Sequence, residues 1–311
     1  MKILVTGGSG FLGSRIVEEA KKEGYEVYCP RSLYMDLYDY KDVKKYLNCY
    51  KPDVIIHSAA YYGGIGICNS EPVNLFRNNT IMTTNIYQAA ADCGVKKVVA
   101  VGSACSYPAC VEGDMSENDF WNGEMHETVE AYGSSKKIQI IAQNAYYKQF
   151  GLEGNHLVLT NLYGEGDVFT EYRSHVVSAL IKRFSDEIQN GSTEIVNWGD
   201  GSPVREFIHV SDAAKALVSA VKLDHDLKPI NIGTGIGTSI KELVEIVSGI
   251  TGFKGDLKWD TSKPNGVARK VLDVSRMKNI FPDISFIPLE QGLQKTINWY
   301  LSNKEEADSR K

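Results

Sequence analysis

A tyrosine and a lysine four positions apart are the first residues of this sequence whose types and spacing suggest chemistry. Tyr132 and Lys136 stand at the start of a predicted helix, where a spacing of four places both side chains on one face. A tyrosine hydroxyl is a poor acid–base catalyst at its ordinary pKa of about 10, and a neighbouring ammonium group favours the phenolate. We therefore expect Lys136 to lower the pKa of Tyr132 toward neutral pH. The spacing alone is weak evidence, because the same pattern is common on surface helices.

A serine and a cysteine follow the apolar run Val98 to Val101, which predicts a strand. Ser103 stands at the end of that strand, where its hydroxyl can join Tyr132 in binding a carbonyl oxygen. Cys105 lies two residues further on. Judged by its neighbours alone, Cys105 is a packed thiol, because free cysteine usually behaves as a small buried hydrophobe.

Three glycines stand between the first apolar run and the first helical stretch. Gly7, Gly10 and Gly13 have the spacing G-x-x-G-x-x-G. Glycine is needed in such a turn because the backbone bends tightly, approaches a pyrophosphate and lets the helix pack closely on the strand. The start of the helix, at Phe11 and Leu12, adds free N–H groups and the positive end of a helix dipole. The sequence therefore predicts a dinucleotide site, with an ordinary glycine turn as the alternative.

The end of the second predicted strand indicates which nicotinamide cofactor this turn holds. A carboxylate there would bind the ribose 2′-hydroxyl, whereas an arginine accommodates a 2′-phosphate. The chain has Arg31 at this point and no carboxylate before Asp36. We therefore expect NADP, with Arg31 and Ser9 near the 2′-phosphate and with Asp36 and Leu37 beside the adenine. The alternative is that Arg31 is a solvated loop residue.

Apolar runs alternate with helical stretches through the first 160 residues, and these elements must position the residues above. The predicted strands are Ile3 to Thr6, Tyr25 to Cys29, Val54 to His57, Val98 to Val101 and His156 to Thr160, and the predicted helices are Phe11 to Glu23, Tyr40 to Asn48, Leu75 to Asp92 and Ser134 to Phe150. This alternation predicts a parallel sheet buried on both faces. The expected fold class is α/β, with a Rossmann-type doubly wound sheet.

The alternation weakens after Gly164. Later helices are expected at His175 to Gln189, Asp212 to Val221, Ser239 to Thr251 and Leu289 to Leu301, and later strands at Glu194 to Trp198, Glu206 to Val210 and Pro229 to Ile232. We predict an NADP-binding Rossmann domain over residues 1–165, to which later strands return near 205–235. Residues 166–311 are expected to form mainly a smaller α/β lobe for the substrate, interleaved with the first.

Composition limits the partners. With 34 Lys and Arg against 39 Asp and Glu, the net charge of -5 offers no positive field to a polynucleotide, so local groups must hold any phosphate. No run approaches about 18 apolar residues and the start lacks a signal-type stretch, so we expect a cytoplasmic protein without a membrane partner. The six cysteines form no C-x-x-C pair, and we expect neither disulfides nor a metal site.

Taken together and in this order, the motifs resemble those of the extended short-chain dehydrogenase/reductase family over essentially the whole chain. Within that family, the resemblance is strongest to the branch that acts on GDP-linked 4-keto sugars. The segments that carry it are Ala59-Ala60, Gly63-Gly64-Ile65, Gly102-Ser103-Ala104-Cys105, Tyr107-Pro108, Thr160-Asn161-Leu162-Tyr163-Gly164, Ser174-His175-Val176, Trp198-Gly199-Asp200-Gly201, Arg205-Glu206-Phe207, Ser262-Lys263-Pro264-Asn265-Gly266 and Arg269-Lys270.

The resemblance implies a homodimeric, NADPH-dependent enzyme that epimerises C3 and C5 of a GDP-4-keto-6-deoxy-hexose and then reduces C4, with GDP-L-fucose as the expected product. It implies that Cys105 and His175 exchange protons with the sugar while Ser103 and Tyr132 hold the enolate oxygen. It also implies cofactor contacts from Ala59, Ala60, Tyr132, Lys136, Asn161, Leu162 and His175, and substrate contacts from Ser103, Lys136, Asn161, Arg183, Trp198, Arg205 and Lys263.

Other interpretations stay open. Ala104 stands where relatives often carry a second serine and is also found in epimerases that keep NAD bound, so a redox-neutral GDP-sugar 3,5-epimerase with NAD is one alternative. A C4 reductase of a related GDP-linked deoxysugar or heptose is another, and a non-catalytic nucleotide sensor is a third. Taken singly, His175 also fits a helix cap, Arg183 a solvated helix position and Trp198 a core position.

Overall fold

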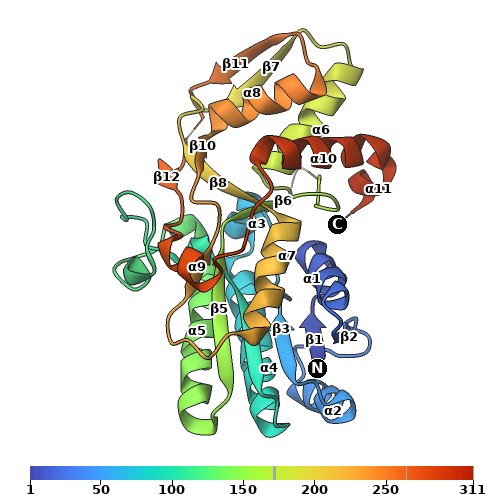
Figure 1. Cartoon of the computed structure of the whole chain (residues 1–311). Helices are drawn as coiled ribbons and strands as arrows, with labels where there is room; N and C mark the ends of the chain where they lie inside the picture. Colours follow the sequence, from blue (N-terminus) through green and yellow to red (C-terminus); the bar gives the residue numbers. More distant parts are fainter. Residues whose placement is uncertain (171–172, 264, 311) are drawn as a thin grey trace.

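A six-stranded parallel sheet forms the larger part of the molecule in the computed structural model, which describes residues 1–170, 173–263 and 265–310 (Figure 1). From one edge to the other, its strands are β2 (Glu26–Tyr28), β1 (Lys2–Thr6), β3 (Val54–His57), β4 (Lys97–Ser103), β5 (Glu153–Leu159) and β9 (Ile230–Ile232). The chain leaves β1 toward β2 and then crosses back to β3, so the winding reverses between β1 and β3. Ligands of open α/β sheets bind at the carboxyl ends of the strands at such a reversal.

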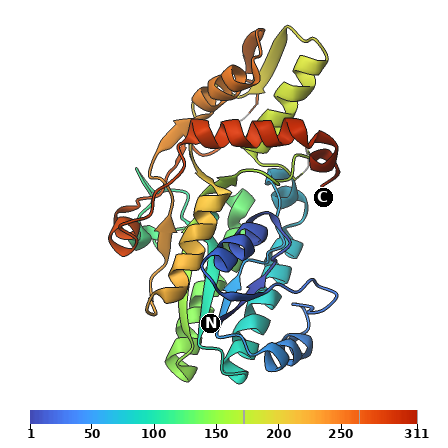
Figure 2. The same cartoon turned by 45° about the vertical axis from the view of Figure 1, so that its right-hand side comes forward.

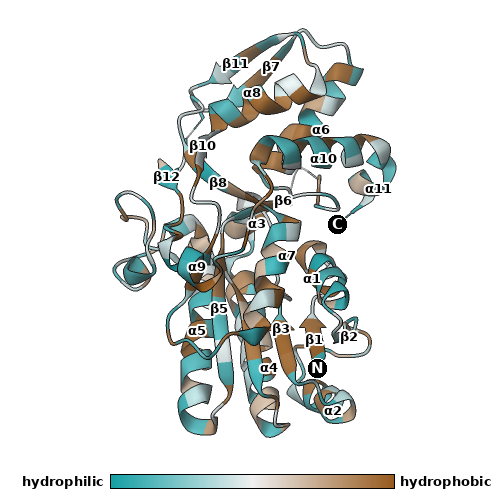
Figure 3. Ribbon diagram, in the orientation of Figure 1, coloured by the Kyte–Doolittle hydropathy of each residue, from teal (hydrophilic) through white to brown (hydrophobic). Residues whose placement is uncertain are grey.

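Helices cover both faces of this sheet because neighbouring residues of each strand point to opposite faces. Ile3 and Val5 pack in one buried cluster with α1 (Phe11–Lys22) and α7 (Val210–Ser219), whereas Leu4 packs in another with α2, α4 and α5. The helices of that second face are α2 (Tyr40–Tyr50), α4 (Pro72–Asp92) and α5 (Glu130–Phe150). Figure 3 shows apolar residues concentrated on the central strands β1 and β3. The predicted Rossmann-type α/β fold is confirmed.

A smaller part stands above the carboxyl ends of these strands (Figure 2). It holds two small sheets and their helices: β6 (Asn161–Tyr163), β8 (Val204–His209), β10 (Gly237–Ser239) and β12 (Arg269–Lys270) in one sheet, β7 (Glu194–Trp198) and β11 (Asp256–Asp260) in the other, and α6 (Val176–Gln189), α8 (Ile240–Thr251), α10 (Leu289–Ser302) and α11 (Lys304–Ser309). Aromatic and aliphatic side chains from β8, α6, α8 and α10 form its own core. Helices α3 (Ile65–Ser70) and α9 (Ser275–Ile280) complete the fold.

The later strands only partly follow the sequence prediction. Strand β9 joins the six-stranded sheet, whereas β8 pairs with β6, β10 and β12 in a sheet of its own. The short strands β6, β10 and β12 were not expected, because two or three residues are too few to display a periodic pattern. The domain boundary at residue 165 stays a prediction. Pro264, in one of the segments that carry the resemblance, lies outside the described residues.

Two further features concern membrane-spanning helices and the loop that follows β6. None of the helices that the structure describes is long and apolar enough to cross a membrane. The loop after β6 is held from two sides: Arg15 of α1 donates to the carbonyl of Glu165 at 3.1 Å, and Arg310 donates to the carbonyl of Gly166 at 2.6 Å. Arg310, in the last residues that the structure describes, therefore contacts the loop that leads into the smaller part.

Candidate active site

The glycine turn connects β1 to α1 at the reversal point of the sheet. Gly7 has a φ of +67°, and a Cβ at this position would lie 2.8 Å from the Cα of Ala59. A Cβ on Gly13 would lie 2.0 Å from the carbonyl oxygen of Gly7, so α1 can pack this closely only because Gly13 has no side chain. The N-cap of α1 is Gly10, which leaves the first N–H groups of the helix without a side-chain cap. These features fit a dinucleotide pyrophosphate.

A cavity of about 500 Å³ opens beside this turn. Its lining includes thirteen residues that the sequence proposed for the cofactor or the chemistry: Gly7, Ser9, Gly10, Phe11, Leu12, Gly13, Ala59, Ala60, Ser103, Tyr132, Lys136, Leu162 and His175. Nine other residues that the sequence proposed are not among the residues described as lining this cavity: Arg31, Asp36, Leu37, Cys105, Asn161, Arg183, Trp198, Arg205 and Lys263. The glycine turn and the tyrosine–lysine pair therefore share one cavity, which spacing in the sequence could not establish.

Tyr132 and Lys136 lie on the first turns of α5, and both are buried. The Lys136 Nζ donates to the carbonyl of Val101 at 2.9 Å and lies 5.6 Å from the centroid of the Tyr132 ring. Burial lowers the pKa of Lys136 to about 8, because a charged ammonium loses its hydration. The pair therefore has the expected side-by-side arrangement on one face of the helix.

The prediction that Lys136 lowers the pKa of Tyr132 is wrong for this structure. Burial raises the pKa of Tyr132 above its ordinary value, and the nearby thiols of Cys105 and Cys68 raise it further. The ammonium of Lys136 is directed at the Val101 carbonyl, so desolvation dominates over charge attraction. Tyr132 is therefore a neutral hydroxyl at neutral pH, a state suited to donating a proton.

Ser103 is the last residue of β4, and Cys105 follows two positions later. The backbone N–H of Cys105 donates to the Ser103 Oγ at 3.2 Å, which caps the short helical turn Ala104–Ser106. Cys105 packs with Tyr132, Ile67 and Leu75 in a small apolar cluster. The thiol therefore lies next to the tyrosine although it does not line the cavity.

His175 stands at the N-cap of α6 and does line the cavity. Its Nδ1 lies 3.4 Å from the hydroxyl of Tyr62, and its Nε2 is buried without a hydrogen-bond partner among the residues that the structure describes. Burial lowers the pKa of His175 to about 4, so the imidazole is neutral at neutral pH. An unpartnered nitrogen at the cavity wall can accept or donate one proton.

The four residues expected at the nucleotide end of the substrate lie in the smaller part. Arg183 on α6 donates to the Asn197 Oδ1 at 2.6 Å and to the carbonyl of Val196 at 3.3 Å. The Nζ of Lys263 lies 5.9 Å from the ring centroid of Trp198, which is 70% exposed. Strand β7 thus brings Arg183, Trp198 and Lys263 together. Trp198 does not belong to the core, because alternate residues of this edge strand point to solvent.

Arg205 belongs to β8, between β10 and β12. It donates to the carbonyl of Val204 at 2.8 Å, and burial lowers the pKa of its guanidinium as it does for Arg183. Asn161, at the start of β6, donates to the carbonyl of Glu206 at 2.8 Å. Arg205 and Asn161 therefore lie on strands that pair with one another, and Leu162, the residue after Asn161 on β6, lines the cavity.

The segment after β2 holds the residues expected beside the adenine and the 2′-phosphate. Arg31 is exposed, and Cys29 lies against the glycine turn, since a Cβ on Gly8 would be 2.5 Å from its Cβ. The Asp36 Oδ1 accepts from the N–H of Tyr38 at 2.9 Å, and Asn85 donates to the carbonyl of Leu37 at 2.9 Å. The segment is thus anchored next to the turn, in the region that the cofactor prediction requires.

Several cavity residues were not found from the sequence. Tyr38, Tyr62, Asp167 and Arg173 all line the cavity. Burial raises the pKa of Asp167 to about 6, although the hydroxyl of Ser178 and the N–H of Val168 donate to this carboxyl. Only Tyr62 had a nearby signal, because it directly precedes the Gly63-Gly64 segment.

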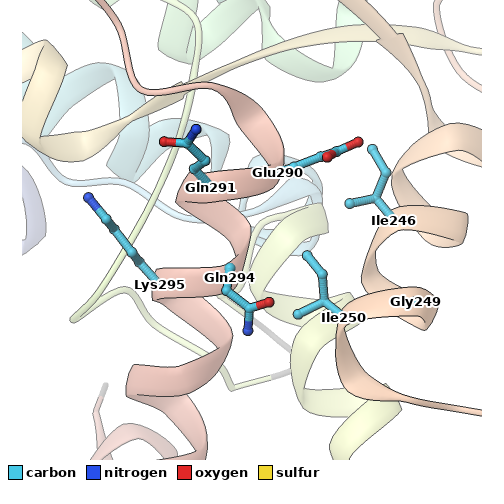
Figure 4. Close-up of a pocket in the computed structure, with 7 residues that line it drawn as sticks. All are labelled: Ile246, Gly249, Ile250, Glu290, Gln291, Gln294 and Lys295. Atoms are coloured by element: carbon cyan, nitrogen blue, oxygen red, sulfur yellow. The ribbon is translucent and has the colours of Figure 1, made fainter.

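A second hollow, of about 630 Å³, lies between α8 and α10 (Figure 4). It is an open surface groove lined by Ile246, Gly249, Ile250, Glu290, Gln291, Gln294 and Lys295. Although it is larger, it contains none of the described residues that the sequence proposed for chemistry. The candidate active site is therefore the cavity beside the glycine turn.

The sheet is doubly wound, the glycine turn lies at its reversal point, and a buried tyrosine–lysine pair lines the same cavity as the turn. These are the features of an α/β enzyme that binds a dinucleotide. Residues 3–233 match the NAD dependent epimerase/dehydratase family, and the chain belongs to that family. The predicted resemblance is confirmed.

Several known proteins are similar to this chain over nearly its full length. A putative GDP-L-fucose synthase 2 of Arabidopsis thaliana is 37% identical over 305 residues, which cover 97% of this chain and 92% of the relative. The GDP-L-fucose synthase of Escherichia coli is 33% identical over 316 residues, with 98% of each covered. The crystal structure of a GDP-L-fucose synthetase from Naegleria fowleri bound to NADP has a TM-score of 0.91 at 28% identity and covers 99% and 95% of the two chains.

A GDP-6-OMe-4-keto-L-xylo-heptose reductase of Campylobacter jejuni is also similar in structure. Its TM-score is 0.89 at 26% identity, over 97% of this chain and 98% of the other. The same fold therefore occurs with a related reaction on a different GDP-linked sugar.

Proposed function

We propose that this protein is an NADPH-dependent epimerase and reductase that converts GDP-4-keto-6-deoxy-D-mannose to GDP-L-fucose. The observation that carries the proposal is the single cavity in which the glycine turn, the Tyr132–Lys136 pair and His175 meet. The full-length likeness to GDP-L-fucose synthases and to an NADP-bound synthetase supports the substrate and the cofactor.

The chain's own groups can hold the cofactor at three points. The N–H groups at the start of α1 receive the pyrophosphate, and Arg31 receives the 2′-phosphate. Lys136 lies beside Tyr132 and can donate to ribose hydroxyls as well as to the Val101 carbonyl, since an ammonium has three donors. Bound NADPH supplies the hydride that C4 of the sugar receives.

Epimerisation uses the acidity that the 4-keto group gives to the protons on C3 and C5. His175 lines the cavity, and Cys105 packs against Tyr132 outside that lining, on a different element. We assign to one of them the removal of a proton from a ring carbon and to the other the return of a proton from the opposite face. The charge that develops on O4 is held by the hydroxyls of Ser103 and Tyr132. Each cycle inverts one carbon and leaves the total number of protons unchanged.

Reduction uses the same carbonyl. When C4 receives a hydride, O4 needs one proton, and the neutral hydroxyl of Tyr132 supplies it. The phenolate that remains is stabilised by the neighbouring Lys136, whose pKa of about 8 lets it return a proton toward solvent near neutral pH. The GDP end of the substrate is assigned to Arg183 and Arg205 for the phosphates and to Trp198 and Lys263 for the nucleoside.

The decisive experiment incubates the purified protein with GDP-4-keto-6-deoxy-D-mannose and either NADPH or NADH in deuterated water. We expect one NADPH consumed per product, deuterium at C3 and C5, and GDP-L-fucose as the product. Reaction without net NADPH consumption would identify a redox-neutral epimerase instead.

In the same assay, R31A is expected to raise the KM for NADPH about tenfold and to leave the KM for NADH unchanged.

The second candidate function is C4 reduction of a related GDP-linked deoxysugar or heptose, which the Campylobacter jejuni neighbour favours. A pure reductase transfers the hydride without exchanging ring protons. Product that contains no solvent deuterium at C3 and C5 would therefore establish this second function and exclude the first.

We also infer that the protein is a cytoplasmic homodimer. Val73 and Phe76 on α4 and Ile141 on α5 are large apolar side chains exposed on two helices that pack side by side. Exposed apolar groups on adjacent helices fit an isologous contact with a second copy. Analytical ultracentrifugation is expected to give twice the chain mass, and a monomer at micromolar concentration would contradict the inference.

A further inference from the structure

Three aromatic rings stand in a row at the cavity. The ring centroid of Tyr62 lies 4.9 Å from that of His175, at an interplanar angle of 29°, and 5.5 Å from that of Tyr132, at 44°. The Tyr62 hydroxyl lies 3.4 Å from the Nδ1 of His175. Tyr62 is therefore in contact with two of the three side chains to which proton transfers are assigned, His175 and Tyr132, and none of the roles described above uses it.

The loop that carries Tyr62 is held on both sides. On the α4 side, the buried Asn79 accepts from the N–H of Tyr61 at 2.8 Å and donates to its carbonyl at 2.9 Å. On the α6 side, Arg173 donates to the carbonyl of Tyr62 at 3.3 Å. The backbone position of Tyr62 is thus fixed relative to the segment that leads into α6.

Glycine lets this loop approach the segment before His175. A Cβ on Gly64 would lie 2.8 Å from the carbonyl oxygen of Ser174, a separation that side chains do not tolerate. The backbones of the two segments therefore touch, and the ring of Tyr62 reaches His175 because of that contact. The neighbouring Tyr61 points away, since its hydroxyl donates to the Glu71 Oε2 at 2.5 Å.

The consequence for His175 is a restricted ring. Its Nδ1 faces the Tyr62 hydroxyl, so the unpartnered Nε2 is the nitrogen left for a ligand at the cavity wall. A stacked ring of this kind limits rotation about the histidine side chain, because aromatic pairs prefer particular relative orientations. A side chain that transfers protons must be held to within about 0.5 Å of its productive position.

We propose that Tyr62 is a positioning residue: it stacks on His175, packs at a tilt against Tyr132, sets the distance between them, and directs the Nε2 of His175 at the sugar ring. The inference rests on the proposed function, because it assigns a purpose to Tyr62 only if His175 exchanges protons with the substrate. The step to which the inference applies is epimerisation. A ring proton leaves C3 or C5 to form the enolate, and a proton from the opposite side restores the C–H bond.

The stack and the hydroxyl make different contributions, and two variants separate them. Y62F keeps the ring and removes the hydroxyl, whereas Y62L removes both. Because 3.4 Å is long for a hydrogen bond, we expect the ring to carry most of the effect. Y62F should therefore retain at least a third of the wild-type rate, and Y62L should lose about tenfold to thirtyfold.

The measurement is the deuterium content of the product made in deuterated water, along with the rate of NADPH oxidation. If Tyr62 positions His175, Y62L releases product with less than one deuteron at C3 or C5, because hydride transfer overtakes incomplete epimerisation. Y62F restores full labelling. A merely structural defect lowers the rate and leaves the label at both carbons complete, and that result would overturn the proposal.

The chain offers a matched control pair outside the cavity. Tyr147 stacks on His225 with ring centroids 3.6 Å apart and is 41% exposed, close to the 42% of Tyr62. Y147L is expected to retain wild-type rate and labelling. NADPH binding and the thermal unfolding midpoint of each variant show that it is folded. Wild-type protein that incorporates no deuterium at all refutes the proposed function itself, which is a different outcome from altered labelling in Y62L alone.

Discussion

The two parts of the molecule that supply the candidate site hold their side chains in different ways. In the six-stranded part, Lys136 and Tyr132 are 1% and 7% exposed and stand on a 21-residue helix that packs along the sheet. In the smaller part, Trp198 is 70% exposed and stands on a five-residue strand that pairs with β11 in a two-stranded sheet. One part fixes its groups by burial, whereas the other leaves Trp198 in solvent and Arg183 and Arg205 only half-buried.

This difference matches the different demands of proton transfer and of substrate binding. Proton transfer requires fixed geometry and altered pKa values, and both come from burial. Binding of a diphosphate and a base requires charge and ring surface that remain reachable. Changes in the buried part should therefore reduce turnover or stability, whereas changes in the exposed part should mainly weaken substrate binding.

The largest effect is expected for Y132F. Removal of the hydroxyl leaves O4 without its proton donor, and NADPH oxidation should fall by about 10²–10⁴-fold. The control is Y107F. Tyr107 is also buried but lies away from the cavity, and its hydroxyl donates to the Asn231 Oδ1 at a distance of 2.6 Å. Y107F should keep its turnover and lose about 1 kcal/mol of stability. Turnover of Y132F within threefold of wild type would show that the buried part does not perform the chemistry.

The second prediction concerns stability and pH for K136M. Burial lowers the pKa of Lys136 to about 8, so between pH 8 and about 10.4 the unfolded chain binds more protons than the folded one. The wild-type free energy of unfolding should therefore rise with pH through this window relative to K136M, by about 3 kcal/mol in total. Urea denaturation at pH 7 to 10.5 measures it, and parallel curves for the two proteins would contradict burial as the cause.

The third prediction concerns the turn that the buried part offers to the cofactor. In G13A the new methyl group meets the Gly7 carbonyl at 2.0 Å, and we expect a loss of about 1–3 kcal/mol in stability with at least tenfold weaker NADPH binding. G249A is the control, because a Cβ there meets nothing within 4 Å and alanine favours a helix. Unchanged NADPH affinity in G13A, measured by titration calorimetry, would remove the turn from the cofactor site.

The smallest effect is expected in the exposed part, for R183K. A lysine cannot reproduce the planar fork that donates to Asn197 and to a diphosphate, so the KM for the GDP-sugar should rise about tenfold with kcat nearly unchanged. K182R, at the adjacent position, alters the ion pairs of Lys182 with Asp186 and Asp308 and should leave both constants unchanged. A lower kcat at constant KM in R183K would break the proposed division between the two parts.

Much of the fold was predictable because its signals are local. The strand-to-helix turn at Gly7, the apolar runs of β1 and β3 and the long helices α4 and α5 each display a pattern over a few neighbouring residues. The boundaries were less accurate. Helix α5 begins at Glu130, four residues before the predicted start, so it includes Tyr132 within its first turn.

The site was predictable to the extent that residue type and spacing define it. Spacing paired Tyr132 with Lys136 but gave the wrong direction for the pKa of Tyr132, because spacing does not report burial. Tyr62 was not found, since its partner His175 lies 113 positions further along the chain. Cys105 was placed beside the chemistry by resemblance, and the structure puts it against Tyr132 but outside the cavity lining.

The sequence by itself determined the α/β alternation, the glycine turn and the tyrosine–lysine pair, because each depends on interactions between residues close along the chain. Only the tertiary structure decided that the turn, Tyr132 and His175 share a cavity, that Lys136 loses its hydration, and that Tyr62 packs against both His175 and Tyr132. The physical reason is that burial and ring contacts arise from packing between distant segments, which a local pattern does not encode.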